Sequence, residues 1–204
     1  TTETTKRPDG SKTVVESKED GTVVILDTAK DGSTIKTVDH PNGTVEIAIK
    51  QANGLTASVT TTLSSAQAEV RLPSKVIQGA EGDAVPLPIP ALPASSLSDA
   101  VADITVHTGA SRPVPIEIPA EGSVTTVAYL VDKDGNETML KTAVLDDGQI
   151  TVSVPDGATV RLRDNVRSFD DTSGHWAEES IAFVTARELF VGETAAAFGP
   201  ETLL

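Results

Sequence analysis

Asp20-Gly21-Thr22-Val23-Val24-Ile25-Leu26 is one unit of a pattern that returns every eleven residues through the first 63 positions. Its turn pair recurs without slippage as Asp9-Gly10, Asp20-Gly21, Asp31-Gly32, Asn42-Gly43 and Asn53-Gly54. Such pairs are preferred in two-residue type I′ turns, which need positive φ at both positions. The arms between the turns are rich in β-branched residues. The repeat therefore predicts an antiparallel β-meander with nine-residue arms, each about 30 Å long.

The function of the repeat has two interpretations. A calcium-binding β-roll is one, because such folds are also rich in Asp and Gly. However, one Asp per repeat cannot supply the six or more oxygen ligands that calcium takes. The other is a plain stalk, in which Val45, Ile47 and Ile49 share one face of a one-sided sheet. Residues 1–63 are therefore interpreted as a hairpin stalk that acts as a spacer.

A small all-β sandwich or barrel-like module is expected over residues 64–166. Around the turn pairs Asp134-Gly135 and Asp156-Gly157, strands are predicted at 123–131, 137–141, 149–154 and 158–162. The first two of these strands form a hairpin.

Proline stands at every second position in residues 86–90 and again in residues 113–115. Alternate residues of a strand point their N–H groups to the same side, so this spacing removes the donors from one edge. Both stretches are predicted to be protected edge strands, with a polyproline spacer as the alternative.

The composition of the 204 residues narrows the function classes. A net charge of −14 and a pI near 4.5 repel phosphates, which disfavours a nucleic-acid partner. Hydrophobic residues at 38% and aromatic residues at 3% are few for a large enzyme-like core. The chain has no cysteine and no long apolar run, so neither disulfides nor a membrane span are expected. Because it opens on Thr1 without a signal peptide, we expect a mature product or an excised fragment.

No catalytic constellation is present in the sequence. His40, His107 and His175 fall in three different segments, so a shared catalytic or metal site is not expected. Residues 132–137 resemble a shortened calcium loop, but the third acidic position and the distal Glu are missing. A hairpin turn is the better interpretation of that stretch. The sequence therefore predicts a non-enzymatic chain with no cofactor and no metal site.

The last segment, residues 167–204, holds all four Phe residues and the only Trp. Because aromatic side chains have the largest burial energies, the best-defined piece of core is expected here. A helix is predicted after the turn, with Thr172 or Ser173 as its N-cap and Gly192 as its C-terminal stop. The residues expected to face a core at helical spacing are Ala177, Ile181 and Val184, together with Phe169.

This segment resembles the first two thirds of a module of the S-layer homology (SLH) family. The match extends over about 36 of the 204 residues and rests on Phe169-Asp170, His175-Trp176-Ala177, Ile181, Ala186, Leu189, Gly192 and Phe198-x-Pro200. The β region from about Val101 to Asn165 is also similar to segments that precede SLH modules in large bacterial surface proteins. The chain is thus identified as ending in a short α-helical partial SLH module.

The resemblance implies a bacterial cell-surface protein that attaches non-covalently to secondary cell-wall polysaccharide. In the family, three modules usually form a pseudo-threefold bundle with ligand grooves between them. By position, Asp170 and Trp176 are the candidates nearest a groove for cell-wall polymer binding. The alternatives, which we favour, are packing of Trp176 under its own helix and a turn or capping role for Asp170.

Two departures from the family pattern affect these expectations. Glu188 stands where the family usually has Gly, and Ala195-Ala196 replaces the common Asp-Gly turn. The Thr-Arg-Ala-Glu-type motif of the family would begin after Leu204. The resemblance implies that the Arg of this motif binds the anionic ligand. A planar guanidinium matched to a carboxylate is hard to replace. Weak binding by this chain alone is therefore expected.

The leading hypothesis is a non-enzymatic stalk and anchor segment of a surface-layer protein, located outside the cell at the bacterial wall. One alternative is the attachment tail of a secreted wall- or polysaccharide-acting hydrolase whose catalytic domain lies upstream. Another is an adhesin whose middle β module binds sugar. The scarcity of aromatic residues for stacking argues against the adhesin.

Overall fold

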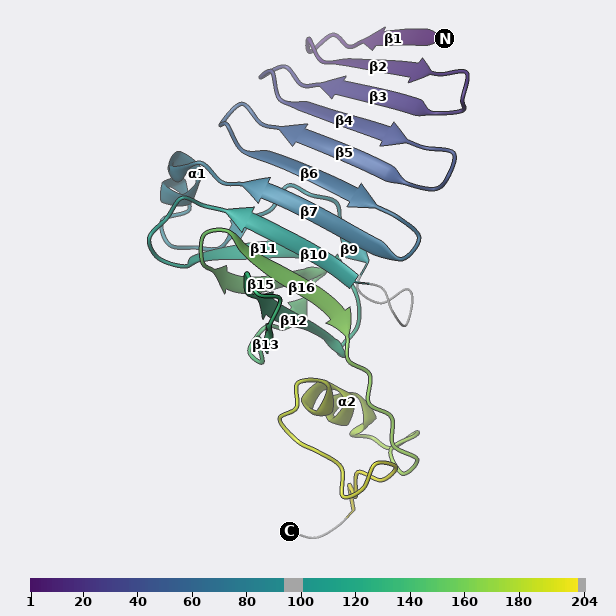
Figure 1. The fold of residues 1–204 in the computed structure, drawn as a ribbon, viewed down its shortest axis with the longest axis vertical. Coiled ribbons are helices and arrows are strands. Elements are labelled where there is room, and N and C mark those ends of the chain that lie inside the picture. The colour runs from purple at the N-terminus through teal and green to yellow at the C-terminus, as the bar shows by residue number, and fades with distance from the viewer. Residues whose placement is uncertain (94–100, 202–204) are drawn as a thin grey trace.

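The structure, a computed structural model, describes residues 1–93 and 101–201 and is built mainly from β-strands (Figure 1). The predicted mainly-β class with a short helical segment near the C-terminal end is therefore confirmed. Residues 94–100 and 202–204, which fall within the predicted second and third segments, lie outside the described part.

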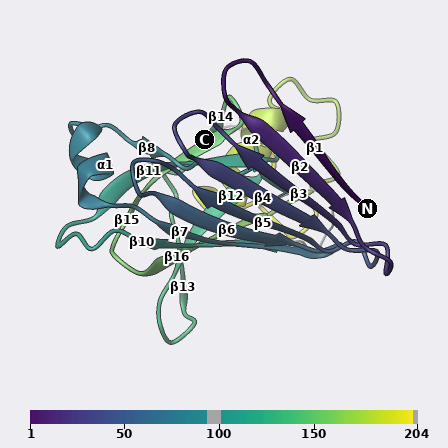
Figure 2. The same ribbon diagram turned by 90° about the horizontal axis from the view of Figure 1, so that it is seen from above.

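The repeat folds into the predicted antiparallel meander. Its strands are β1 (Thr2–Lys6), β2 (Lys12–Ser17), β3 (Val23–Thr28), β4 (Thr34–Asp39), β5 (Val45–Lys50) and β6 (Thr56–Thr61). Each pairs with the next, and the strands twist progressively along the sheet (Figure 2). The strands are shorter than the predicted nine-residue arms because each connection takes up more residues than a two-residue turn.

The turns of the repeat are not the predicted type I′ turns. In the first, the Gly10 N–H donates to the Arg7 carbonyl (3.1 Å) and the Arg7 N–H donates to the Ser11 carbonyl (2.9 Å). Of these residues only Gly10 has positive φ, at 92°. This is a type I turn followed by a glycine bulge, and it recurs at Gly21, Gly32, Gly43 and Gly54.

The Asp or Asn of each turn explains this choice of turn. Asp9 Oδ1 accepts the Ser11 N–H at 2.9 Å, and the equivalent bond forms in the other four turns at the same distance. A side chain that bonds the backbone two residues on stabilises the turn with ordinary negative φ at its own position. The Ser11 hydroxyl and then the Ser11 N–H lower the pKa of Asp9, and the backbone N–H bonds lower the pKa of Asp20 and Asp31.

The sheet of the stalk continues into the second segment. β7 (Ser65–Arg71) pairs antiparallel with β6 and parallel with β10 (Val101–His107). Beyond β10 follow β16 (Ala158–Asp164), β12 (Thr126–Val131) and β13 (Glu137–Met139). One eleven-stranded sheet therefore runs without a break from the stalk through the β module.

A second, smaller sheet completes the predicted sandwich. Its order is β14 (Leu145–Asp146), β15 (Gln149–Val154), β11 (Val114–Glu121) and β8 (Val85–Pro86), and β9 (Leu92–Pro93) also pairs with β11. The core between the two sheets is aliphatic and includes the fully buried side chains of Ile104, Ile116, Val160 and Leu162. The type I′ turn occurs here, at Asp147-Gly148, with φ of 46° and 75°.

The two proline stretches behave differently. Of the stretch 86–90, only Pro86 lies in a strand, the edge strand β8 (Val85–Pro86), and residues 87–90 lie outside any strand. The prediction for this stretch therefore holds only at Pro86. Val114 and Pro115 begin β11 and pair only with β15, whereas β11 as a whole has partners on both sides. The prediction of a separate edge strand is therefore wrong for the strand, although these two residues have one unpaired side. The parallel partners β8 and β9 pair with β11 only at residues 116–117 and 120–121. The prolines at 115 and 119 fall outside these pairs, so the missing donors are tolerated.

α1 (Ser74–Gly79) is a short helix within the module that was expected to be all β. Its Val76 and Ile77 are half-buried and pack against the sandwich core. A short apolar stretch does not distinguish a helix from a strand by periodicity alone.

Burial decreases from the sandwich toward the N-terminal end of the stalk. Ile49, Ala57 and Val59 still belong to the core, whereas all five residues of β1 are exposed. Strands β1 to β3 form a single layer in the part of the chain that the structure describes (Figure 1).

The expectation that the best-defined piece of core lies among the C-terminal aromatic residues is wrong. The core belongs to the aliphatic sandwich, whereas among residues 167–201 the buried apolar side chains are those of Ile181 and Ala186. Over residues 1–93 and 101–201, no helix has the length and apolar character to cross a bilayer.

Candidate functional site

The C-terminal module, residues 167–201, is organised around α2 (Glu178–Ala186). The residue that caps its N-terminus is Ala177, so the prediction of Thr172 or Ser173 as N-cap is wrong. The Thr172 hydroxyl instead donates to the Phe169 carbonyl (3.0 Å), which closes the preceding turn. Ile181 is buried, as predicted from the helical spacing.

The helix ends before the predicted stop at Gly192. The Glu188 N–H donates to the Thr185 carbonyl and the Leu189 N–H donates to the Val184 carbonyl, both at 3.0 Å. Glu188 has a φ of 53°. This is a Schellman motif, in which the left-handed position favours glycine. Glu188 thus occupies a backbone conformation that suits glycine better than a residue with a Cβ.

Trp176 lies directly before α2 and is 90% exposed. The expectation that it packs under its own helix is therefore wrong. Its ring centroid is 5.4 Å from that of His175. His175 is held on both sides, since Nδ1 accepts the Ala177 N–H (3.1 Å) and Nε2 lies 2.8 Å from Glu201 Oε1. The module thus presents an indole face on a fixed backbone.

Asp170, the second candidate residue, is exposed at the preceding turn. Its N–H donates to the Ala196 carbonyl (2.8 Å). The side-chain role in the turn belongs to Asp171, whose carboxylate accepts the N–H groups of Phe198 (2.8 Å) and Gly199 (2.7 Å). These bonds lower the pKa of Asp171. Sequence reasoning missed this role because the partners of Asp171 are distant along the chain.

Arg187 joins the module to the β-sandwich and is only 1% exposed. Its Nη1 donates to the Val124 carbonyl (2.7 Å), and its Nη2 donates to the carbonyls of Thr126 and Ala143 (both 3.1 Å). Its guanidinium carbon lies 3.9 Å from the ring centroid of Phe183. Burial lowers the pKa of Arg187. Sequence reasoning missed this residue, since nothing in the local pattern distinguishes a buried Arg from an exposed one.

Further contacts fix the position of the module. The Asn165 amide donates to the Ala186 carbonyl (2.6 Å) and Lys141 Nζ donates to the Glu188 carbonyl (3.0 Å). Ala186 is fully buried against Val127 and Tyr129 of β12. The helix end is therefore packed on the outer face of the large sheet, and the exposed indole has a set orientation relative to the stalk.

A polar depression on the outer face of the large sheet is a second candidate surface. It has a volume of about 370 Å³ and is lined mainly by Ser58, Thr60, Gln67, Glu69, Asp103, Thr105 and Thr159. The aromatic residue of the same face, Tyr129, is only 7% exposed, and the Arg163 guanidinium lies 4.2 Å from its ring centroid. This surface therefore offers hydroxyl groups but no free aromatic face.

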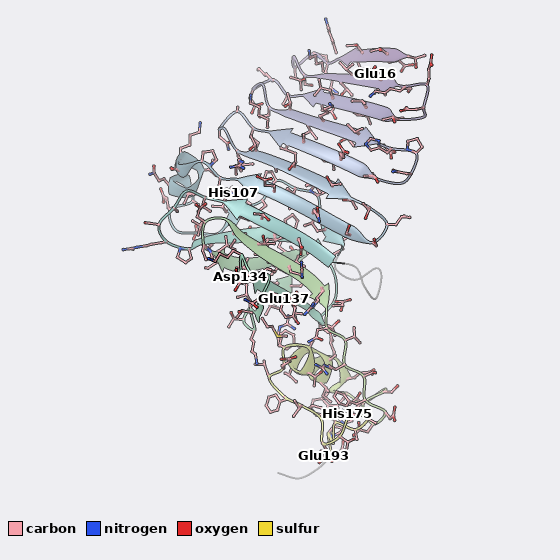
Figure 3. All side chains as sticks on the ribbon, in the orientation of Figure 1. Glu16, His107, Asp134, Glu137, His175 and Glu193 are labelled. Carbon is pink, nitrogen blue, oxygen red and sulfur yellow. The ribbon has the colours of Figure 1, made fainter. Side chains whose placement is uncertain are left out.

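The remaining candidate groups do not converge. His107 and His175 lie far apart along the molecule (Figure 3). The stretch at 132–137 is the predicted hairpin turn, in which Asp132 Oδ1 accepts the N–H groups of Asp134 and Asn136 (both 2.8 Å). Within the described residues, no three His, Asp or Glu side chains are grouped to hold a metal ion.

Comparisons with known proteins assign no family to this chain. No protein-family model matches the chain, and no curated protein matches it either.

Proposed function

We propose that this chain is a non-enzymatic segment of a bacterial surface protein, in which residues 1–63 form a stalk. Its C-terminal module then begins a non-covalent anchor to secondary cell-wall polysaccharide, outside the cell. The observation that carries the proposal is the 90% exposure of Trp176, the only Trp of the chain, within the stretch that resembles an SLH module. Exposure of so large an apolar surface to water is unfavourable in free energy, and burial of the indole against a ligand is therefore favourable.

The chemistry of the site favours stacking over charge as the source of affinity. A sugar ring has an apolar face of C–H groups that fits an indole, and Asp170 beside the same turn can accept hydrogen bonds from hydroxyl groups. The net charge of −14 opposes the approach of an anionic polymer. Binding by one module is therefore weak and needs several copies presented together.

The length of the stalk supports a role as a spacer. The strands β1 to β7 lie side by side at about 4.8 Å, which gives the single sheet a height of about 30 Å. This sheet is continuous with the sandwich, and the sandwich is bonded to the C-terminal module through Arg187. The arrangement suits a spacer that holds an attachment site at a distance.

The adhesin alternative finds less support. Its sugar site would lie on the sandwich, where the outer depression has hydroxyl groups but where Tyr129 is buried beneath Arg163. Sugar binding to protein surfaces commonly needs an aromatic platform. We therefore place the glycan contact at Trp176.

A retention assay tests the proposal. The chain is coupled at high density to beads and incubated with wall sacculi that carry the secondary polysaccharide, and with sacculi from which it has been extracted. We expect retention of the first only, reduced at least about fivefold by Trp176→Ala, which corresponds to about 1 kcal/mol. Leu63→Ala, which removes an 80% exposed apolar side chain from the stalk, is the matched control and leaves retention unchanged. Equal retention of extracted sacculi, or no effect of Trp176→Ala, rejects the anchor assignment.

A further inference from the structure

His175 lies directly before Trp176, and its imidazole connects the start of α2 to a segment 26 residues further along the chain. Nδ1 accepts the Ala177 N–H at 3.1 Å, and Nε2 lies 2.8 Å from Glu201 Oε1. The side chain of His175 is 15% exposed, whereas that of Glu201 is 84% exposed. The imidazole is therefore mostly covered, and both of its nitrogens have a partner.

These two bonds fix the tautomer of the neutral ring. A ring nitrogen that accepts a hydrogen bond carries no proton, so Nδ1 is the unprotonated nitrogen. Nε2 then carries the single N–H of the ring and donates it to the Glu201 carboxylate. Ala177 is the N-cap of α2, and the N–H groups at a helix start have no acceptor within the helix. Nδ1 supplies the acceptor that Ala177 needs.

A second proton on the imidazole removes this acceptor. Imidazoles gain that proton between about pH 8 and 5, and here it binds to the free nitrogen Nδ1. The imidazolium then directs an N–H at the Ala177 N–H, so this bond is lost, whereas the bond from Nε2 to Glu201 is retained. The positive end of the α2 dipole lies at the same helix start and repels the added charge.

The charged groups around His175 come from three parts of the module. Glu201 bonds to the ring, Asp171 lies in the preceding turn, and Glu178 lies in the first turn of α2 and accepts the Gly174 N–H at 2.8 Å. All three are carboxylates. Carboxyl groups ordinarily titrate near pH 4 and imidazoles about two units higher. The range from about pH 7.5 to 5.5 therefore reports on imidazoles.

We propose that neutral His175 is the positioning residue for Trp176, and that protonation at Nδ1 releases the indole, so that the glycan contact is lost in acid. The inference rests on the proposed function, because the contact that it regulates is that of Trp176. The two ring centroids are 5.4 Å apart, with 37° between the ring planes. A movement of the imidazole therefore changes the surroundings of the indole directly. The contact holds near neutral pH and is released below about pH 6.

NMR of the free chain tests the positioning role without a ligand. The chain has one Trp, so its single indole N–H signal reports on this site alone. We expect this signal and the Ala177 amide signal to shift with a common midpoint between about pH 5 and 8. The protection of the Ala177 amide against exchange should fall at least about fivefold across that midpoint. The nitrogen signals of the neutral imidazole should show the proton on Nε2.

Two variants separate the imidazole from its surroundings. His175→Asn is the matched control, because an Asn side chain accepts the N–H two residues on, as Nδ1 does, but does not titrate. Both signals should then stay in place over the same pH range, although His40 and His107 are still present. Glu201→Gln keeps an acceptor for the Nε2–H and removes only the charge. It should follow the wild type.

Retention on wall sacculi tests the regulation. We expect wild-type retention to fall at least about fivefold between about pH 7.5 and 5.5, and retention of His175→Asn to be equal at both. Equal wild-type retention at the two pH values overturns the proposal. So does an Ala177 amide that stays protected in acid, a neutral ring with its proton on Nδ1, or a wild-type pH dependence in His175→Asn. Failure of the anchor assignment is recognised separately, because Trp176→Ala then leaves retention at neutral pH unchanged, and the NMR titration alone decides the positioning role.

Discussion

Glu188 is a residue whose backbone conformation does not suit its side chain. It holds the left-handed position of the Schellman motif with a φ of 53°. A Cβ at such a position costs about 1 kcal/mol relative to glycine. We therefore expect Glu188→Gly to be more stable than Glu188→Ala by about 1 kcal/mol in chemical denaturation. Both variants remove the carboxylate that pairs with Arg167 at 3.4 Å, so the comparison isolates the backbone. Equal stability of the two would mean that the helix end relaxes to negative φ.

Asp171 makes the C-terminal module sensitive to acid. The N–H groups of Phe198 and Gly199 lower its pKa in the folded chain. The stabilisation is therefore complete above the unfolded pKa of about 4 and is lost as the pH falls through the lower folded value. We expect protection of the Phe198 and Gly199 amides to fall with acid in the wild type and to be low at every pH in Asp171→Ala. Asp170→Asn is the control and follows the wild type, since its carboxylate does not bond these amides. Acid-independent protection in the wild type would contradict this account.

Among the elements, the stalk turns differ in their surroundings although their sequences are alike. Gly21 and Gly32 have φ of 87° and 85°. A Cβ on Gly21 would lie 3.1 Å from Pro41 Cγ in the next turn on the same side, whereas a Cβ on Gly32 would meet open space. We expect Gly32→Ala to destabilise the chain by about 1 kcal/mol through the backbone alone, and Gly21→Ala by more. Thermal unfolding followed by circular dichroism measures both, and equal losses would show that the turns do not pack on one another.

The turns also show how far the sequence predicts the elements. The period of eleven predicted the meander, its antiparallel pairing and the position of every turn. It did not predict the turn type, because Asp-Gly and Asn-Gly suit both a type I′ turn and a type I turn with a glycine bulge. At Asp147-Gly148 the same dipeptide does form the type I′ turn. The difference lies in whether the Asp side chain bonds the residue after the glycine, as Asp9 does with Ser11.

The candidate site was predicted less completely than the fold. The resemblance named Trp176 and Asp170 as candidate binding residues, and that stays a prediction. Burial energies predicted a packed indole, whereas the structure exposes it. Asp171 and Arg187 were missed because their partners are distant in sequence, from 27 residues at Phe198 to 63 at Val124. Secondary structure produces periodic and local patterns that can be recognised in a single sequence. A contact between two polar residues that are far apart along the chain produces no such pattern.

At the scale of the whole molecule, the structure joins a stalk, a sandwich and a C-terminal module into one continuous body. The first junction is a shared sheet, since β6, β7 and β10 are hydrogen-bonded neighbours. The second junction is small and polar, and depends on Arg187 inserted between α2 and the loops of the sandwich. A pull on the module would therefore separate the molecule at this second junction before it disturbed the sheet.

Replacing Arg187 tests that junction. Arg187→Met keeps much of the side-chain volume but leaves the carbonyls of Val124, Thr126 and Ala143 buried without a donor, and each such loss costs about 1–3 kcal/mol. We expect the unfolding free energy to fall by about 3 kcal/mol or more, with faster amide exchange in α2 and no change in β2 to β6. Arg167→Met is the matched control, because its exposed pair with Glu188 contributes less than about 1 kcal/mol. If the two variants lose the same stability and α2 stays protected in both, the module is held by the apolar contacts of Ala186 with β12 and not by Arg187.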